Sequence, residues 1–428
     1  MRKVLISVFL TSLIFSLFAT DSRVLTMGRS DYFFMDDISI YRNPANISLY
    51  PNMLFGEMGI YVEDPALDDT GDLAALKRHN RDPQKPCFGG NLSYSLNQSA
   101  DAGDQFPMLS LGLVFNRYDK MLNYILPGSS DFLGIIDKNV IRIDNDTIVG
   151  KVDVITGFAL KNGIMLGLGG YFAFAKQKIR KQDTKEAKII KGNVGINFPI
   201  VKTMDLEVSV NGGVLSKITR ADVRNPLDST DISNNVLLTL AKNDLFLASD
   251  VRLFSALSSI NGDVVPHFGI ELIKYNQDKN RLLTFNAGLA ININIDRGFF
   301  WAGVEGSYVD NDAKKFGTEY KTYESIAGKV HFGIERNIIW DWFVWRLGCS
   351  KIVRYEKIGG ANGITRWSEN PEADASDDDH VGFGLGLNIE NRFKVDAVIA
   401  EDIFYTFTNL ISGSHHHIAT RISATYSF

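Results

Sequence analysis

The feature that most constrains the fold is an alternation of apolar and polar residues that recurs along the whole chain. Within residues 381–389, Val381, Phe383 and Leu385 alternate with glycines, and residues 206–214 and 283–294 repeat the pattern. Because successive side chains on a strand point to opposite faces of a sheet, each such segment has one apolar and one polar face. The pattern therefore predicts an all-β fold.

The length of these segments separates two classes of β protein. About sixteen segments of roughly ten residues carry the pattern, long enough for a tilted strand to cross a bilayer, whereas strands in soluble sandwiches typically have five or six residues. The segments are residues 54–61, 88–97, 107–116, 150–160, 164–176, 188–199, 204–215, 247–257, 264–275, 281–294, 299–309, 323–336, 342–352, 380–390, 393–402 and 417–428. We predict a transmembrane antiparallel β-barrel of 14–16 strands; an exported soluble β protein is the alternative.

The connections between the segments supply a second argument. They alternate between long and short, as the outer loops and periplasmic turns of outer-membrane barrels do, with one exception: residues 276–280 are short where a long connection is due. The connections expected to be long are 62–87, 117–149, 177–187, 216–246, 310–322, 353–379 and 403–416. Sixteen strands would place the short turns and both chain ends on one side. Residues 236–240 are ambiguous, because they also fit a helix in a loop.

The N-terminus has the form of an export signal. Arg2 and Lys3 precede an apolar run over residues 4–19, which is short for a membrane-spanning helix. We predict that residues 1–20 are a signal peptide, with an uncleaved anchor as the alternative, and that the protein resides in a bacterial outer membrane. The net charge of -5 is scattered, so nothing indicates a nucleic-acid partner. The two cysteines, Cys87 and Cys349, are too few for a disulfide framework.

Aromatic residues near the short turns fit an interfacial belt. Trp340, Trp342 and Trp345 flank one turn and residues 299–301 (Phe-Phe-Trp) flank another. The chain ends on an alternating segment containing Tyr426 and Phe428, which resembles the assembly signal of outer-membrane barrels. The expected partners are therefore outer-membrane lipid and the barrel-assembly machinery.

The polar faces of the segments carry both signs of charge. A Lys or Arg facing lipid at mid-bilayer would cost about 2–4 kcal/mol, so these side chains should face the lumen. The predicted lumen-lining residues are Glu57, Lys151, Asp153, Lys191, Asp205, Glu207, His267, Glu271, Glu305, Lys329, His331, Glu335, Arg346, Lys394, Asp396 and Arg421. Such a lining can serve transport, or it can simply hold the interior together.

A barrel of this width leaves an open lumen unless something fills it. Residues 21–53 precede the wall (residues 54–428), lack strand or helix periodicity, and contain two prolines, yet they are rich in apolar residues such as Phe33, Phe34 and Met35. We predict that residues 21–53 form a hatch inside the barrel; a disordered lead-in is the alternative.

Three short motifs in this segment carry a resemblance. Met27-Gly28, Asp36-Asp37 and Asn43-Pro44-Ala45, just before the first strand, resemble the N-terminus of the FadL-like family of outer-membrane barrels. That family includes channels for long-chain fatty acids and aromatic hydrocarbons, and PorV-type proteins that assist secretion. The resemblance implies a hatch role for Asn43, Pro44 and Ala45, and a wall of fourteen strands.

No motif makes a convincing catalytic or metal site. Three consecutive residues such as His415–His417 cannot all face one ion, and the acidic run at 377–379 before His380 is typical of a solvated loop tip. Ser414 beside His415 has no identifiable orienting acid. We expect no enzyme and no cofactor.

The most economical functional hypothesis is a channel for hydrophobic or amphipathic small molecules that is gated by the hatch. The alternatives are a PorV-like scaffold that binds secreted proteins and does not transport, and, less favoured, a barrel hydrolase.

Overall fold

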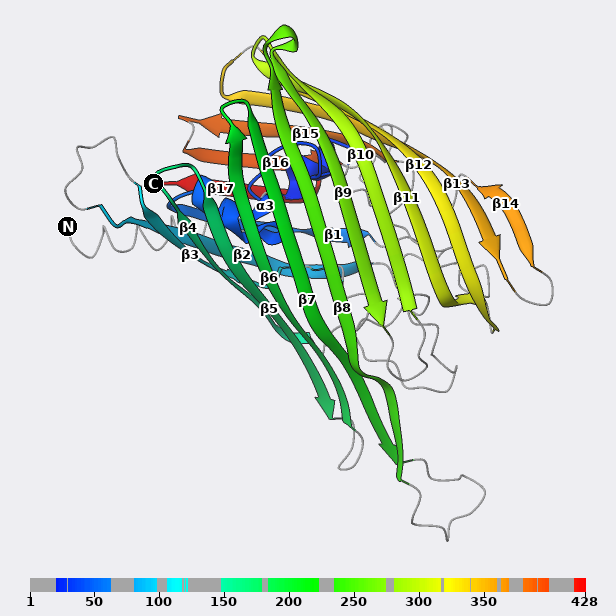
Figure 1. Ribbon diagram of the computed structural model, residues 1–428. Helices are drawn as coiled ribbons and strands as arrows, with labels where there is room; N and C mark the ends of the chain where they lie inside the picture. Colours follow the sequence, from blue (N-terminus) through cyan, green and yellow to red (C-terminus); the bar gives the residue numbers. More distant parts are fainter. Residues whose placement is uncertain are drawn as a thin grey trace, which may run out of the picture.

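Antiparallel strands follow one another around a closed wall in the computed structural model of the chain (Figure 1). The structure describes residues 21–62, 81–97, 106–121, 148–178, 184–222, 235–274, 281–316, 319–359, 363–368, 380–399 and 419–428, apart from single gaps at 29, 118, 120, 339 and 391. The ring closes where β1 (Met53–Val62) pairs with both β2 (Arg81–Ser95) and β17 (Ala419–Ser427). The predicted signal peptide lies outside the described residues.

Seventeen strands are present in the described residues, and sixteen of them form the ring. Between β2 and β17 the wall consists of β3 (Met108–Phe115), β4 (Ile148–Ala159), β5 (Met165–Lys178), β6 (Thr184–Val201), β7 (Met204–Asp222), β8 (Asn235–Leu257), β9 (Gly262–Lys274), β10 (Arg281–Ile295), β11 (Gly298–Phe316), β12 (Glu319–Asn337), β13 (Phe343–Ile358), β15 (His380–Ile389) and β16 (Phe393–Ile399). This count agrees with the alternating pattern and differs from the fourteen strands that the family resemblance implied.

The additional strand, β14 (Ile364–Ser368), was not predicted. It pairs with the C-terminal part of β13, from Arg354 to Ile358, whereas the N-terminal part of β13, from Phe343 to Ser350, pairs with β15. Its five residues are too short for an alternation to be recognised.

Several strands are much longer than the predicted ten residues. β7 has 19 residues and β8 has 23, so most of the predicted loop 216–246 is strand, and residues 236–240 are not a helix. The predicted loops 177–187 and 310–322 likewise consist mostly of strand. These extensions pair with each other, as in Lys217↔Ala241 and Lys314↔Lys321. Their backbone pairing continues where their sequence no longer alternates, which is why the pattern missed them.

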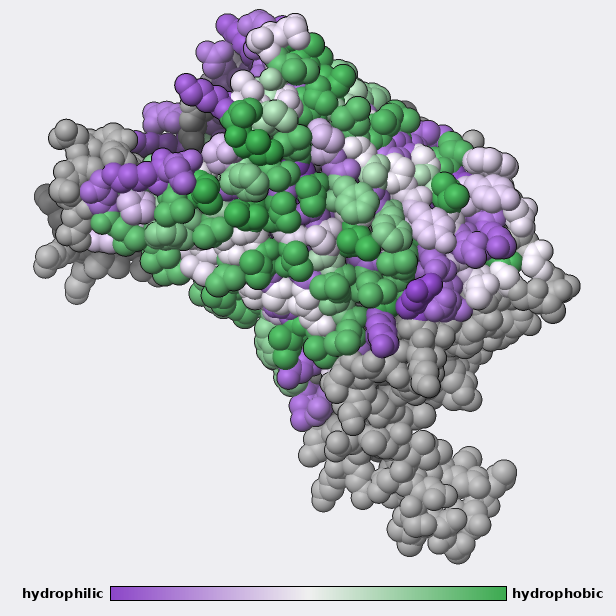
Figure 2. Space-filling model, viewed as in Figure 1, coloured by the Kyte–Doolittle hydropathy of each residue, from purple (hydrophilic) through white to green (hydrophobic). Residues whose placement is uncertain are grey.

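The outer face of the wall is apolar. Figure 2 shows hydrophobic residues covering the middle of the strands, with hydrophilic residues towards their ends. Leu92, Val194 and Val330, on three different strands, are 62%, 57% and 56% exposed. A face of this kind is suited to lipid. Among the described residues, no helix has the length and apolar character needed to cross a membrane.

The aromatic belt is only partly as predicted. The rings of Trp340 and Trp342 are exposed and stack at 5.1 Å beside the turn between β12 and β13. Trp301, assigned to the same belt from the sequence, is instead completely buried and faces the lumen. The alternation on β11 extends to the N-terminal end of the strand. The side chains of Phe299 and Trp301 therefore point inward, on the same face of the strand as Gly303.

Candidate functional site

The N-terminal segment lies within the barrel as a plug, residues 21–52, that touches separate parts of the wall (Figure 1). It contains two short helices, α2 (Asp21–Thr26) and α3 (Ser39–Arg42), and a 3-10 helix, η1 (Pro44–Leu49). The first helix contacts β13 and β15–β17, whereas η1 contacts β3–β6. The plug therefore bridges the lumen from one part of the wall to another. Met53, predicted as its last residue, is the first residue of β1.

The Asn-Pro-Ala motif starts the 3-10 helix. The side-chain oxygen of Asn43 accepts a hydrogen bond from the backbone nitrogen of Ala45 at 3.1 Å, and Pro44 occupies the first helical position, where no donor is needed. The Asn43 side-chain nitrogen donates to the Ile196 carbonyl of β6 at 3.2 Å. All three motif residues are buried, so the motif both shapes the plug and attaches it to the wall.

Glycines on the inner face of β4–β6 form a seat for this helix. A Cβ at Gly167 would lie 2.1 Å from the Ala45 backbone nitrogen, and one at Gly195 would lie 1.8 Å from the Asn43 side-chain oxygen. Gly157 faces Ile47 in the same way. Only glycine permits the plug backbone to approach the wall this closely. Sequence reasoning did not identify the seat, although glycines on a polar strand face were its signal.

The start of the plug is fixed to the wall by charge. Arg23 forms ion pairs of 2.7 Å with Asp36 of the plug and with Glu335 of β12. Glu335 also pairs with Arg346 of β13 at 2.5 Å, and Arg346 pairs with Asp396 of β16. Three predicted lumen residues are thus joined into one network with a plug arginine that the sequence analysis did not single out.

The pKa values of the two acids of the plug motif, Asp36 and Asp37, are shifted in opposite directions. Burial, followed by the charge of Asp36 and a hydrogen bond with it, raises the pKa of Asp37 well above its usual value. Burial also acts to raise the pKa of Asp36, but the hydrogen bond from Asp37 and the charge of Arg23 lower it below the usual value overall. Asp37 therefore keeps its proton to a higher pH than Asp36 does. Thr425 of β17 donates to Asp37 at 3.4 Å.

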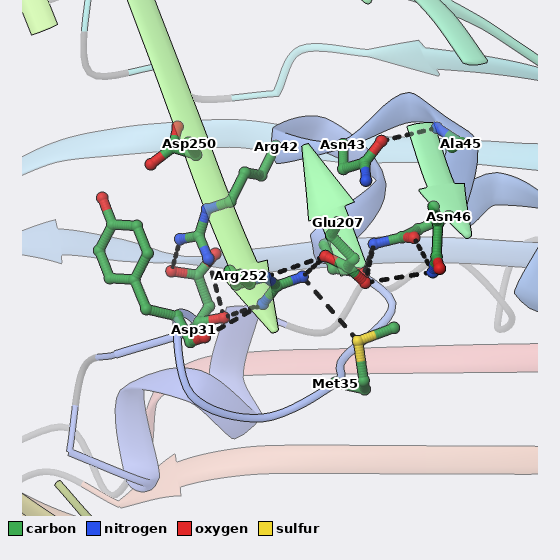
Figure 3. Close-up of polar contacts among 12 residues, drawn as sticks. Asp31, Met35, Arg42, Asn43, Ala45, Asn46, Glu207, Asp250 and Arg252 are labelled. Atoms are coloured by element: carbon green, nitrogen blue, oxygen red, sulfur yellow. Dashed lines mark hydrogen bonds and ion pairs between the residues drawn. The ribbon is translucent and has the colours of Figure 1, made fainter. Parts of the chain in front are cut away.

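A second polar cluster lies where the plug meets β7 and β8 (Figure 3). Arg252 donates to the Glu207 carboxylate through Nε at 2.9 Å and to the Asp31 carbonyl of the plug at 2.8 Å. Asn46 of the plug donates to Glu207 at 3.2 Å. Asp31 also forms an ion pair with Arg42. Both wall residues are buried, so plug groups complete the hydrogen bonding of a buried ion pair.

An aromatic cluster packs beside this pair. Phe33 is fully buried against Trp301, with ring centroids 5.7 Å apart, and lies 6.1 Å from both His267 and His331. The His331 Nδ1 lies 3.0 Å from the Gly28 carbonyl. Gly28 has φ of +90°, a conformation that favours glycine. Phe34 also packs on Trp301, at 5.5 Å, and Met35 lies near Arg252.

The other predicted lumen residues are more dispersed. Glu57 pairs with Arg421 across β1 and β17 at 2.6 Å, so these two residues contribute to closure of the ring. The remaining wall positions differ in burial: Lys151, Glu271, Glu305 and Lys329 are half-buried, whereas Asp205 and Lys394 are exposed beside short turns. Tyr426 and Phe428 stack at 6.2 Å on the lipid face.

A small recess of about 30 Å³ remains between the plug and β4–β7. Arg117, which follows β3, donates to both oxygens of Asp153 at 2.9 and 2.7 Å, and its guanidinium lies over the rings of Tyr41 and Tyr171. Lys191 of β6 donates to Asp119 at 2.8 Å. Arg117 was not predicted from the sequence, because it lies in a segment read as loop.

The sequence motifs considered for catalysis or metal binding lie mostly outside the described residues. The part of the chain that the structure describes holds no group of three or more potential metal ligands, and Cys87 and Cys349 are not joined by a disulfide. The motifs 377–379 and 414–417 lie outside the described residues; His380 is the first residue of β15.

Comparison with known proteins finds similarity only to solved structures. No protein-family model and no curated protein sequence matches the chain. The toluene transporter TodX of Pseudomonas putida matches with a TM-score of 0.42 and 8% identity, over 96% of this chain and 99% of that one. A FadL homologue of Pseudomonas aeruginosa matches with a TM-score of 0.37 and 10% identity, over 96% and 100%. CdiB of Escherichia coli matches at 0.40 and 8%, over 88% and 63%. Similarity this low leaves the ligand of the present chain to be argued from its own residues.

Proposed function

We propose that the protein is an outer-membrane channel for small hydrophobic or amphipathic molecules, and that its plug controls their passage. The observation that carries the proposal is the position of the plug, which crosses the lumen between the glycine seat on β4–β6 and the ion pairs on β12 and β13. A segment needed only to fill the lumen could be held by apolar contact alone. This one is held by charged groups, whose attachment depends on pH and competing ligands.

The mixed chemistry around the plug favours small molecules over bulk solvent flow. Apolar residues of the plug pack into two clusters, one around Ile47 with Phe55, the other around Phe33 with Trp301. The recess beside Tyr41, of about 30 Å³, has room for only one or two water molecules. We expect no catalysis, and no cofactor.

Replacement of residues 23–50 by a flexible Gly/Ser linker of equal length tests the gating role. In liposomes, the altered protein should show higher conductance and faster uptake of a small amphiphile such as decanoate than the intact chain. Heat-modifiable electrophoretic mobility verifies that the barrel has assembled. Equal conductance and uptake in the two proteins would contradict the proposal.

A second candidate is a surface scaffold that binds secreted proteins and does not transport. The observation that favours it is the β7–β8 hairpin, whose pairing runs out to Asp222↔Asn235 and which extends beyond its neighbours in Figure 1. Shortening this hairpin by replacing residues 219–238 with a two-residue turn separates the candidates. A channel keeps its uptake, whereas a scaffold loses the attachment of its secreted partners.

A further inference from the structure

One edge of β8 continues beyond the strand that borders it. β9 pairs with β8 only as far as Lys274↔Leu245, whereas β8 continues away from the short turns to Asn235, paired on its other side with β7. Figure 1 shows the paired ends of β7 and β8 reaching past the end of β9. Among the described residues, no strand lies against this side of residues 235–243. They form an open sheet edge about 30 Å long at the usual rise per residue.

The backbone of this edge is suited to pairing with another strand. Every second residue of an edge strand directs its N–H and C=O groups away from the sheet. The register with β7 is regular from Ile218↔Thr239 to Asp222↔Asn235, because both register shifts of this pair lie closer to the wall. Residues 235–243 contain no proline, and Lys242 is their one charged residue. The prolines and repeated charges that usually protect a sheet edge are therefore missing here.

The same residues are strongly apolar. Residues 236–240 read Val-Leu-Leu-Thr-Leu, and alternate residues of a strand belong to opposite faces, so both faces of this part of β8 carry valine or leucine. They lie farther from the short turns than Leu245, which is 48% exposed on the lipid face of the strand. Apolar residues beside one another on neighbouring strands stabilise the pairing of those strands.

Two occupants are excluded by the geometry of the chain and the membrane. The connection between β9 and β10 joins Lys274 to Arg281, which pair with each other, and residues 275–280 are too few to follow the edge outward and return. A second copy in the same membrane has the same orientation, so its β8 would run in the same sense. Symmetric pairing of a strand with its own copy is antiparallel, which this orientation does not allow. Lipid chains offer no hydrogen bonds to an open edge.

We propose that the edge of β8 over residues 235–243 binds an extended apolar segment of a partner protein, which joins the sheet as a further strand. Backbone hydrogen bonds would hold the segment, and valine or leucine at alternate positions would favour it over polar segments. The inference goes beyond the proposed channel, because the edge lies on the outside of the wall and its occupation requires no passage. It would also supply the class of partner that a surface scaffold needs.

The hairpin offers a matched pair of variants. Leu238 lies on the edge strand, and Thr219 is its partner on β7. Thr219 also pairs with Lys185 of β6, so it lies in an interior strand at the same level of the same sheet. Leu238→Lys therefore places a charge directly beside an added strand, whereas Thr219→Lys places the same charge one strand farther away.

The experiment is fluorescence anisotropy of a labelled peptide, Ser-Thr-Val-Thr-Val-Thr-Ser, with the purified full chain in detergent. The peptide is used unmodified, with N-methyl groups on every second residue, and with N-methyl groups on consecutive residues. N-methylation removes a backbone donor, so the second form keeps one intact edge and the third keeps none. The first two forms should bind saturably and the third should not.

The protein variants locate the binding. Replacing residues 219–238 by a two-residue turn should abolish it, with heat-modifiable mobility as the check on barrel assembly. Leu238→Lys should weaken binding of the unmodified peptide about three- to fivefold, from the loss of one apolar cross-strand pair, and Thr219→Lys should leave it unchanged.

Four results would overturn the inference: no saturable binding of the unmodified peptide, equal binding of the form methylated on consecutive residues, binding that survives the shortened hairpin, or equal effects of Leu238→Lys and Thr219→Lys. Liposome uptake is a separate measurement. Uptake without peptide binding removes this site and leaves the channel proposal standing, and binding without uptake does the reverse.

Discussion

Arg23 of the plug and Glu335 of β12 are joined by a hydrogen bond of 2.7 Å between Nε and Oε2, although 312 residues separate them in the chain. This contact connects the first turn of the plug to the wall network that continues through Arg346. It also explains why the plug stays attached at its start, where the helix has only six residues. A helix this short is not stable by itself in water.

Arg23→Ala should loosen the plug while leaving the barrel intact. It removes charged hydrogen bonds to both Asp36 and Glu335, which together stabilise the seated plug by about 1.5–3 kcal/mol. Hydrogen exchange at the plug amides of Asn46 and Tyr50 measures this change as faster exchange. The matched control is Arg281→Ala, which breaks an exposed ion pair with Asp310 at the outer end of the wall and should alter nothing.

Gly167→Val should displace the 3-10 helix from its seat. A Cβ at this position would lie 2.1 Å from a plug backbone atom that cannot move independently of the helix, and overpacking of this kind costs about 1–3 kcal/mol. A cysteine at Ala45, probed with a thiol reagent in a background lacking Cys87 and Cys349, should become reactive. Gly170→Val, on the lipid face, should leave Ala45→Cys protected; equal reactivity in both would exclude a specific seat.

The buried pair of Arg252 and Glu207 should show strong coupling between its members. Arg252→Met leaves the Glu207 carboxylate buried without its cation and should destabilise the protein by about 3–5 kcal/mol. Adding Glu207→Leu should recover most of that loss, since neither charge then remains. Thermal unfolding in detergent, followed by circular dichroism, gives the midpoints of the unaltered protein, the single variant and the double variant. A double variant less stable than the single one would show that the pair is not coupled in this way.

The seating of the plug should depend on pH through Asp37. Its pKa is raised in the seated plug, mainly by burial and then by Asp36, so the seated form holds the proton more tightly than a released, solvated plug would. This contribution is complete below the ordinary Asp pKa of about 4 and is lost as the pH rises through the raised value. Exchange of the plug amides should therefore accelerate with pH beyond its intrinsic rise. Asp37→Asn should remove the extra acceleration; an unchanged profile would show that another group is responsible.

The sequence was sufficient to predict the central parts of most wall strands and insufficient to predict the contacts that hold the plug. Strands such as β15 alternate cleanly because one face meets lipid and the other the lumen, so their position and phase could be predicted. The outer parts of β7 and β8 could not, because strands beyond the lipid band keep their backbone pairing without an apolar face. Trp301 was misplaced because an aromatic residue near a turn suits both an interfacial belt and a plug contact.

The plug contacts could not be predicted because they join residues that are distant in the chain. No pattern in the sequence around Arg23 indicates that it pairs with Glu335. Arg117 forms its ion pair with Asp153 only because the folding of β3, β4 and β6 brings Asp153 and Lys191 beside it. The glycine seat could more easily have been predicted from the sequence. Gly157, Gly167 and Gly195 occupy the inward phase of three consecutive strands, where polar side chains would be the ordinary choice.

In the proposed function, the plug must move for small molecules to pass. A disulfide between Thr26→Cys and Gly384→Cys tests it directly, because a Cβ at Gly384 would lie 2.9 Å from the Thr26 Cβ, and a small shift gives the 3.5–4.5 Å that a disulfide prefers. The measurement is uptake into liposomes by this variant, in a background without the two native cysteines, before and after reduction. We expect little uptake while the plug is tethered and recovery of uptake on reduction, and uptake by each single-cysteine variant should not depend on the redox state. Equal uptake in the oxidised and reduced forms would contradict it.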